Sequence, residues 1–244
     1  MHVLRQNILI TGASAGIGAE LARQFASEGR SLALCARRLP ELEALRSELP
    51  GRVLVKPLDV TDTDAVFHVF EEFATELGRL DRVIVNAAIA TSEPIGTGGF
   101  AANRKTVETN VIGALAQCEA AMRVFRRQNA GHLVVISSMA ALRGLPGAST
   151  TYAATKAALS SLAEGIRVDV VGTPIKVTTI LPGYIRSEMN PEPGRLITET
   201  VPAVRAMVTA IEREPKRAFI PPWPWRAMAP VLRYLPARLL KKAT

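Results

Sequence analysis

Short apolar runs alternate with amphipathic segments along most of the chain. The apolar runs at 7–11, 31–36, 53–57, 82–85, 132–137 and 175–181 have the length and composition of buried strands. Helical periodicity follows these runs at about 19–27, 40–49, after Asp62, at 100–127 and at 150–171. Six alternations of strand and helix predict a single α/β domain with a doubly wound parallel sheet, which binds ligands at the carboxyl ends of its strands.

The first predicted strand leads into a glycine-rich loop with the sequence Thr-Gly-Ala-Ser-Ala-Gly-Ile-Gly at 11–18. Glycines let the backbone approach a phosphate, and the start of the following helix offers free N–H groups and a positive dipole end. A tight strand-to-helix turn would need similar residues, but the order of strand, loop and helix is that of a Rossmann-type dinucleotide site. We expect cofactor contacts from Gly12, Ser14, Ala15, Gly16, Ile17 and Gly18.

The second predicted strand ends in Ala36, Arg37 and Arg38. In dinucleotide-binding folds an acidic residue at this place suits a free ribose 2′-hydroxyl, whereas an arginine suits a 2′-phosphate. Because the acid is absent, we predict that NADP(H) is preferred over NAD(H), with Arg37 as the main phosphate contact. The alternative is that both arginines are solvated side chains at the start of a helix.

Composition narrows the class of protein. Hydrophobic residues make up 48% of the chain and charged residues 21%, and no apolar run is long enough to span a membrane. The amino terminus lacks the pattern of a secretory signal, so we expect a soluble, cytoplasmic protein. Cys35 and Cys118 lie in apolar segments, and the three histidines are scattered, so we expect no protein-built metal site.

Tyr152 and Lys156 are four residues apart in the predicted helix at 150–171, so they lie on the same helix face. A lysine charge near a phenol favours the phenolate, and we expect it to lower the pKa of Tyr152 from about 10. Such a phenol could act as a general acid or base. A partly exposed tyrosine beside an unrelated lysine would show the same spacing, so this pair alone does not decide the function.

Several motifs together resemble the short-chain dehydrogenase/reductase family over about residues 5–222. They are the glycine loop at 11–18, Asp59-Val60, Asn86-Ala87-Ala88, Asn110, Ser138, Tyr152 with Lys156, and Pro182-Gly183. The resemblance implies hydride transfer between a nicotinamide cofactor and a carbonyl or alcohol. Members of this family commonly pair through the helices that would contain Asn110 and Tyr152, so we expect a homodimer or homotetramer.

The resemblance also implies a role for each matching residue. Tyr152 is expected to be the general acid or base, and Lys156 to bind the nicotinamide ribose and tune the phenol. Ser138 is expected to orient the substrate oxygen, and Asn110 to hold a water that relays protons to Lys156. The remaining cofactor contacts implied are Asp59 with the adenine amino group, Val60, Asn86, Ala87, Ala88, Pro182, Gly183, Ile185 and Ser187.

Three departures from the family pattern remove no catalytic group. Val85 and Ala88 replace an asparagine and a glycine in the motif around Asn86, which affects the packing beneath the adenine. The interval from Ser138 to Tyr152 is one residue longer than expected, and we assign the extra residue to the loop at 144–151. Ala15 stands where many NADPH-preferring members have a second basic residue, so selectivity would depend on Arg37 and Arg38.

The segment 187–216 is expected to cover the substrate as a lid. Thr198 is a candidate N-cap for its helix, and Val201, Val204, Val208 and Ile211 form an apolar stripe. The stripe favours a lipophilic carbonyl substrate, such as a ketone, a 3-oxoacyl compound or a steroid-like molecule, although it could equally pack the helix on the core. Further candidates for the pocket wall are Leu142, Leu145, Tyr184 and Met189.

Residues 223–244 form a tail that is separate in character from the catalytic region at 1–222. A final strand at 218–220 precedes the sequence Pro-Pro-Trp-Pro-Trp at 221–225, and a helix with kinks at Pro230 and Pro236 could follow. Between 226 and 242 there are five basic residues and no acidic one. The tail could lie on an anionic membrane surface, or it could pack on its own domain or on a second subunit.

Three functions are compatible with these motifs to different degrees. An NADPH-dependent carbonyl reductase or alcohol dehydrogenase uses every catalytic position that is filled here. A non-catalytic NADP(H) sensor would not need Tyr152, Lys156, Ser138 and Asn110 together. A sugar-nucleotide epimerase or dehydratase would have a differently spaced glycine loop and a longer substrate domain. Nucleic-acid binding is not expected, because no such motif is present and the excess of positive charge lies largely in the tail.

Overall fold

A computed structural model describes residues 4–186 and 197–243 of the chain. In these residues a parallel sheet has the strand order β3-β2-β1-β4-β5-β6-β7, which confirms the doubly wound α/β prediction. The strands are β1 (Asn7–Thr11), β2 (Ser31–Ala36), β3 (Val53–Pro57), β4 (Arg82–Val85), β5 (Gly131–Ile136), β6 (Ile175–Pro182) and β7 (Arg217–Ile220).

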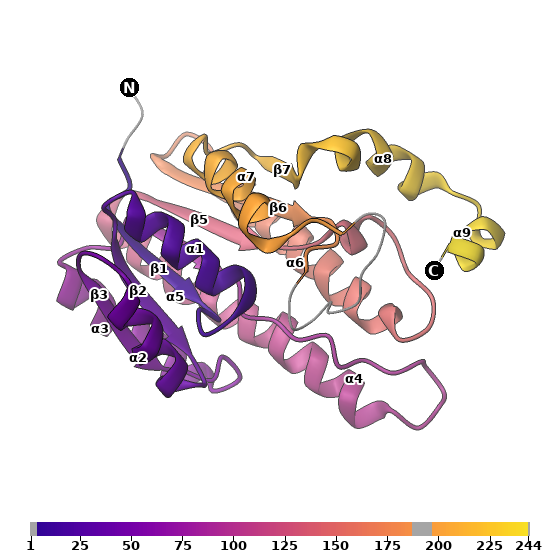
Figure 1. Ribbon diagram of the computed structural model, residues 1–244, viewed down its shortest axis with the longest axis horizontal. Coiled ribbons are helices and arrows are strands. Elements are labelled where there is room, and N and C mark those ends of the chain that lie inside the picture. Colours follow the sequence, from indigo (N-terminus) through magenta and orange to yellow (C-terminus); the bar gives the residue numbers. More distant parts are fainter. Residues whose placement is uncertain (1–3, 187–196, 244) are drawn as a thin grey trace.

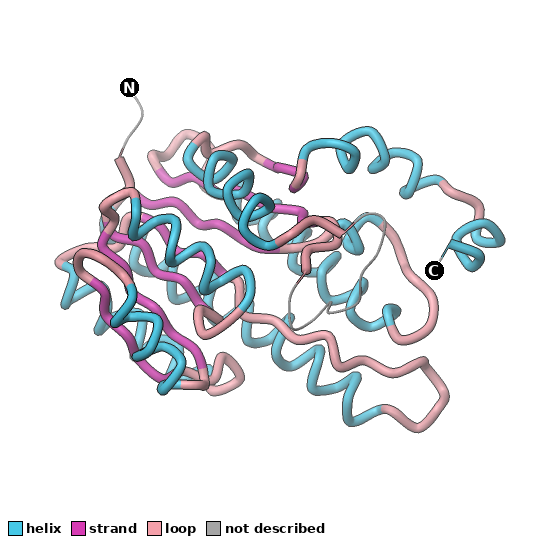
Figure 2. Tube along the Cα trace, viewed as in Figure 1, coloured by secondary structure: helices cyan, strands magenta, loops and turns pink. Residues whose placement is uncertain are grey.

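Helices cover both faces of the sheet (Figures 1 and 2). One face carries α1 (Gly16–Ser27), α2 (Leu39–Glu48) and α7 (Thr200–Glu212), and the other carries α3 (Thr63–Leu77), α5 (Ala114–Gln128) and α6 (Ser149–Asp169). Each face has its own apolar core, because strands buried on both sides present alternate residues to the two helix layers. Cys35 and Cys118 are buried in one of these cores, as expected.

The long helix predicted at 100–127 is not regular. It consists of α4 (Phe100–Val107), the π-helical segment η1 (Glu108–Gly113) and α5, so the predicted range is helical, but its middle part is π-helical, which the sequence did not indicate. At Gly113 a Cβ atom would stand 2.7 Å from the carbonyl oxygen of Val60, so the helix lies against the chain after β3 at this point. A π-helical turn inside an α-helix often marks a functional position, and this one contains Asn110.

The helix within the predicted lid packs on the core. Val204, Val208 and Ile211 of α7 are buried in the same cluster as α1, whereas Val201 is half exposed. The apolar stripe therefore anchors α7, and its interpretation as a substrate-facing surface is wrong. Thr198 is not the N-cap either, because Glu199 precedes the first turn and Thr198 pairs with Ile185 in an isolated β-bridge.

The tail forms two further helices, α8 (Pro222–Tyr234) and α9 (Ala237–Ala243), which extend away from the sheet in Figure 1. The predicted helix thus begins earlier, at Pro222, although Trp223 itself has non-helical backbone angles. Pro230 lies within α8, and Pro236 separates α8 from α9. The inner side of α8 packs on its own domain through Trp225 and Ala229, beside Met139 and Leu181.

A network of buried charged side chains lies at the start of β4, away from the carboxyl ends of the strands. Arg82 is fully buried and donates to Nδ1 of His132 at 2.9 Å and to Glu212 at 2.7 Å. Arg5 pairs with Glu214 at 2.7 Å. Burial, together with the charges of Arg82 and Arg5, lowers the pKa of His132 well below its usual value, so this histidine is neutral and structural.

Candidate active site

The glycine loop forms a narrow cradle at the carboxyl end of β1. Gly12 has a φ of +65° and Gly16 one of +55°, a region that other residues rarely adopt. A Cβ atom on Gly12 would lie 2.8 Å from Cα of Ala87, and one on Gly18 would lie 2.3 Å from the carbonyl oxygen of Gly12. The loop therefore requires glycine at positions 12 and 18. Its backbone meets the start of α1, where a pyrophosphate would be bound.

Asn86 holds the end of β4 against this loop. Its side-chain Nδ2 donates to the carbonyl oxygens of Thr11 at 2.9 Å and Gly12 at 3.3 Å. In return, the Thr11 hydroxyl accepts from the backbone N–H groups of Asn86 at 3.0 Å and Ala87 at 3.1 Å. Asn86 and Ala87 thus hold the cradle in place, together with Thr11, which had no role assigned from the sequence. The cofactor contact expected from Ala88 stays a prediction.

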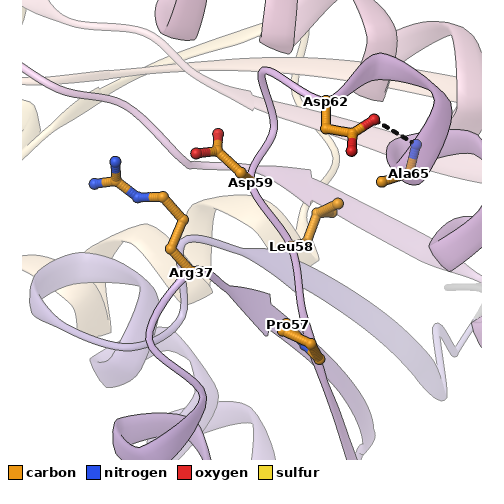
Figure 3. Close-up of a pocket in the computed structure, with 6 residues that line it drawn as sticks. All are labelled: Arg37, Pro57, Leu58, Asp59, Asp62 and Ala65. Atoms are coloured by element: carbon orange, nitrogen blue, oxygen red, sulfur yellow. Dashed lines mark hydrogen bonds between the residues drawn. The ribbon is translucent and has the colours of Figure 1, made fainter.

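A pocket of about 380 Å³ lies beside the cradle, between the ends of β2 and β3. Arg37, Asp59 and Asp62 contribute its polar side chains, and Pro57, Leu58 and Ala65 complete the lining. Figure 3 shows the guanidinium of Arg37 and the carboxylate of Asp59 on the same side of the loop, whereas Asp62 turns away to cap α3. The pocket therefore combines a cation with a carboxylate acceptor, as an adenosine with a 2′-phosphate would need.

The charged side chains at and beside this pocket differ in their contacts with the rest of the protein. Burial by itself would raise the pKa of Asp59, but hydrogen bonds from Thr61 and the charge of Arg37 lower it below its ordinary value. Asp59 is therefore an ionised acceptor. Arg38 donates to the Ser14 hydroxyl at 3.3 Å and lies 3.8 Å from Glu41, while Arg37 is exposed at the pocket.

Tyr152 and Ser138 meet at the carboxyl end of β5. Ser138 precedes the short 3₁₀ helix η2 (Met139–Leu142), and its hydroxyl accepts from the N–H of Ala140 at 3.1 Å. Burial raises the pKa of Tyr152, a hydrogen bond with Ser138 lowers it, and the nearby Tyr184 raises it further, so that the net pKa lies above its ordinary value. The phenol is thus protonated at neutral pH.

Lys156 is a buried cation one turn along α6 from the phenol. Its side chain is 3% exposed, and its Nζ donates to the carbonyl oxygen of Ile136 at 3.0 Å. Burial lowers the pKa of Lys156 to about 8. Its Nζ stands 5.8 Å from the centroid of the Tyr152 ring. The phenol pKa is nevertheless raised and not lowered as expected, because burial outweighs the hydrogen bond with Ser138. The tuning role of Lys156 toward a bound cofactor and the phenol stays a prediction.

Asn110 lies in the π-helical segment and connects it to its neighbours. Its Oδ1 accepts from the N–H of Ile89 at 2.9 Å, and its Nδ2 donates to the carbonyl of Ile89 at 2.8 Å and to the Thr155 hydroxyl at 3.2 Å. This side chain therefore fixes the chain after β4 against α6, next to Lys156. The water-holding role expected for Asn110 stays a prediction.

The segment after β6 lies on the other side of the candidate site. The N–H of Gly183 donates to the carbonyl of Ile220 at 2.8 Å, and Ile185 is buried and bridges to Thr198. Pro182 is the last residue of β6, beside Ile220 in the sheet. Ser187, Met189 and the first part of the predicted lid lie outside the described residues.

Two contributors to the site were not foreseen from the sequence. Ser137 supports α6, because its hydroxyl donates to the carbonyl of Lys156 at 2.9 Å and lies 2.7 Å from the Ser160 hydroxyl. Trp225 of α8 packs against Gly183, although it is far away in the sequence. The serine pair Ser137-Ser138 at a strand end could have indicated the first contact, but nothing in the local pattern indicates the second.

Comparison with known proteins gives one family. The family model described as short chain dehydrogenase matches residues 6–195. An uncharacterized oxidoreductase of Mycobacterium tuberculosis is 46% identical over 98% of each chain, and one of Myxococcus xanthus is 38% identical over 91% of this chain and 88% of its own. The crystal structure of a short-chain dehydrogenase from Streptomyces avermitilis superposes with a TM-score of 0.78 at 26% identity, covering 89% of this chain and 88% of that one.

Buried Lys156 should reduce the stability of the cofactor-free protein. Because its pKa falls from 10.5 in the unfolded chain to about 8, the fold carries a penalty for the charge below pH 8 that disappears as the pH rises toward 10.5. Lys156→Met should therefore raise the free energy of unfolding by up to about 3 kcal/mol at neutral pH. Urea unfolding at neutral and alkaline pH measures this, and a gain that grows with pH would contradict it.

Proposed function

The chain belongs to the short-chain dehydrogenase family and is an oxidoreductase, and we propose that it uses NADPH to reduce a lipophilic ketone or aldehyde to an alcohol. The observation that carries this proposal is the Tyr152 phenol, protonated and hydrogen-bonded to Ser138, one helical turn from buried Lys156. These three residues are the ones that the family's chemistry requires. The reverse oxidation would use the same residues.

The residues of the candidate site would have different roles in such a reaction. A bound nicotinamide would supply the hydride that goes to the carbonyl carbon. Ser138 and Tyr152 are both placed to donate hydrogen bonds to the carbonyl oxygen, where negative charge develops. Tyr152 then gives its proton to that oxygen, which completes the alcohol. Lys156 is placed to bind the ribose of the cofactor and to supply positive charge beside the phenol.

Tyr152→Phe should impair ketone reduction without impairing the binding of NADPH. The variant keeps the ring but loses the proton donor, so kcat for ketone reduction should fall by about 10³-fold while the Kd for NADPH stays nearly unchanged. Stopped-flow absorbance and isothermal titration measure the two quantities, and Tyr234→Phe on the exposed side of α8 is the matched control. Turnover close to wild type in Tyr152→Phe would refute the assignment.

Selectivity for NADPH over NADH is the second part of the proposal. It is supported by the exposed guanidinium of Arg37 in the pocket beside the cradle, and by Ala36 at the end of β2, where an acid would bind the ribose hydroxyls. Asp59 is ionised and has one carboxylate oxygen that takes neither hydrogen bond from Thr61, so it can accept from the adenine amino group.

Ala36→Asp should reverse this preference. The new carboxylate would repel a 2′-phosphate and accept hydrogen bonds from a 2′-hydroxyl, so the NADPH/NADH ratio of kcat/KM should fall by at least about a hundredfold. Ala36→Asn, which is nearly isosteric but uncharged, is the control and should change the ratio far less. An unchanged ratio in Ala36→Asp would count against the proposal.

The substrate is proposed to be apolar. Leu142 and Leu145 follow Ser138 along the chain, and Tyr184, which is half exposed, follows Gly183 near the phenol. A panel of ketones of increasing chain length and ring count, followed by NADPH absorbance, tests this proposal. The ratio kcat/KM should rise with apolar surface. A preference for small polar ketones would contradict a lipophilic substrate without affecting the proposed chemistry.

Assembly into a homodimer or homotetramer is proposed through α5 and α6. Leu115 of α5 and Ile112 of the adjoining segment η1 are partly exposed large apolar side chains, and a small apolar pocket of about 140 Å³ lies between Val111, Leu115, Ala158, Leu159 and Leu162. Such a surface is typical of a subunit interface. Ile112→Arg should therefore lower the mass measured by light scattering to that of a monomer.

Peripheral contact with an anionic membrane is proposed for the outer side of α8, in a protein that is otherwise cytoplasmic. None of the helices within the described part of the chain is long and apolar enough to cross a bilayer. Trp223, Val231 and Tyr234 are exposed next to Arg226 and Arg233, a combination that suits a lipid headgroup region.

The pair of substitutions Trp223→Ser and Tyr234→Ser should abolish sedimentation with phosphatidylserine vesicles. Phe100→Ser on α4 is the control, because Phe100 is equally exposed but lies outside the tail. Equal sedimentation of the wild type, the doubly substituted variant and Phe100→Ser would contradict membrane contact. A change in mass by light scattering without vesicles would instead indicate that a second copy covers this surface.

A further inference from the structure

Trp225 is the deepest contact between the tail and the catalytic domain. It is only 3% exposed, whereas Trp223, the other tryptophan of the chain, is 77% exposed. A Cβ atom on Gly183 would lie 2.1 Å from both Cε2 and Nε1 of Trp225, so the indole ring lies directly on the Gly183 backbone. Any larger residue at position 183 would displace the ring.

The same indole contacts both sides of the candidate site. Its ring lies 6.0 Å from the ring of Tyr184 at an angle of 58°, which is a favourable aromatic arrangement. It also packs with Met139, the residue after Ser138, in the small apolar cluster beneath α8. The tail is fastened to this region a second time, because Arg143 donates to the carbonyl of Leu232 at 3.2 Å and to that of Leu235.

We propose that Trp225 is a positioning residue that fixes the 182–185 segment against the nicotinamide half of the cofactor. The inference rests on the proposed function, and it takes the cofactor contacts that the family resemblance implies for Pro182 and Gly183 to be made to the nicotinamide half. Gly183 is held from one side by the hydrogen bond to Ile220 and from the other by the indole. Without the ring, the segment is free to shift toward the space that α8 occupies. In Figure 1 the described part of the tail lies on the other side of the molecule from β2 and β3, whose ends carry the adenosine pocket with Arg37 and Asp59.

The indole nitrogen of Trp225 indicates that this residue does more than fill the core. Within the described structure, Nε1 of Trp225 is buried and has no hydrogen-bond partner. A buried donor without a partner lowers stability, and a phenylalanine would avoid this cost. The shape of a large flat ring over Gly183 therefore accounts for the tryptophan better than stability does. Trp225→Phe keeps a flat ring, whereas Trp225→Leu removes it.

Ligand binding separates positioning from a merely structural contribution. For Trp225→Leu, the Kd for NADPH should rise about tenfold, while the Kd for adenosine 2′,5′-bisphosphate, which lacks the nicotinamide half, should stay within about twofold. Trp225→Phe should restore most of the NADPH affinity. Trp223→Leu, two residues away and exposed, should bind both ligands like the wild type.

A double-mutant cycle tests the contact itself. Gly183→Ala alone should weaken NADPH binding, because its methyl group collides with the indole. In the double variant with Trp225→Leu the collision is relieved, so the second substitution should add little to the loss. Circular dichroism and thermal unfolding confirm that each variant is folded.

The outcomes keep this inference apart from the proposed function. Wild-type affinity for NADPH in folded Trp225→Leu, equal loss of both ligands, or independent losses in the cycle would each overturn the positioning role. Binding is measured without a carbonyl substrate, so a failure of ketone reduction leaves the test intact. A wild-type protein that binds the bisphosphate and NADPH equally would instead contradict the nicotinamide contact on which the inference rests.

Discussion

The burial of one lysine charge is the constraint on which the candidate site depends. Among the described residues, the side chain of Lys156 donates to one carbonyl at the end of β5, and burial lowers its pKa to about 8. Hydrogen bonds connect the neighbouring elements, since Ser137 and Ser160 support α6 and Asn110 connects it to η1 through Thr155. A cation in such a position favours a ligand that brings hydrogen-bond acceptors.

Much of the fold could be predicted because its signals are local. The alternation of apolar runs with amphipathic segments gave the parallel sheet, and the glycines at 12 and 18 indicated a cradle that the structure shows to be sterically closed to larger residues. The position of Tyr152 near Lys156 followed from helical spacing alone. These features need only short-range geometry, so the sequence contains them directly.

The errors arise where distant parts of the chain meet. The apolar stripe on α7 could not reveal which surface it faces, and only packing against α1 shows that it belongs to the core. The buried pair of Arg82 and His132, the contact of Trp225 with Gly183, and the interruption of the helix at Asn110 likewise depend on neighbours far along the chain. The pKa of Tyr152 was mistaken for a similar reason, because the cost of desolvation depends on everything around the phenol.

The pH dependence of ketone reduction at saturating NADPH tests the central claim that a neutral Tyr152 delivers the proton. A phenol whose pKa is raised above its ordinary value stays in its donating form throughout the neutral range, and Lys156 loses its charge at about pH 8. The account predicts a kcat that is constant below pH 8 and decreases at higher pH. A kcat that increases with pH through the neutral range would show that the ionised phenol is the active form and would contradict the account.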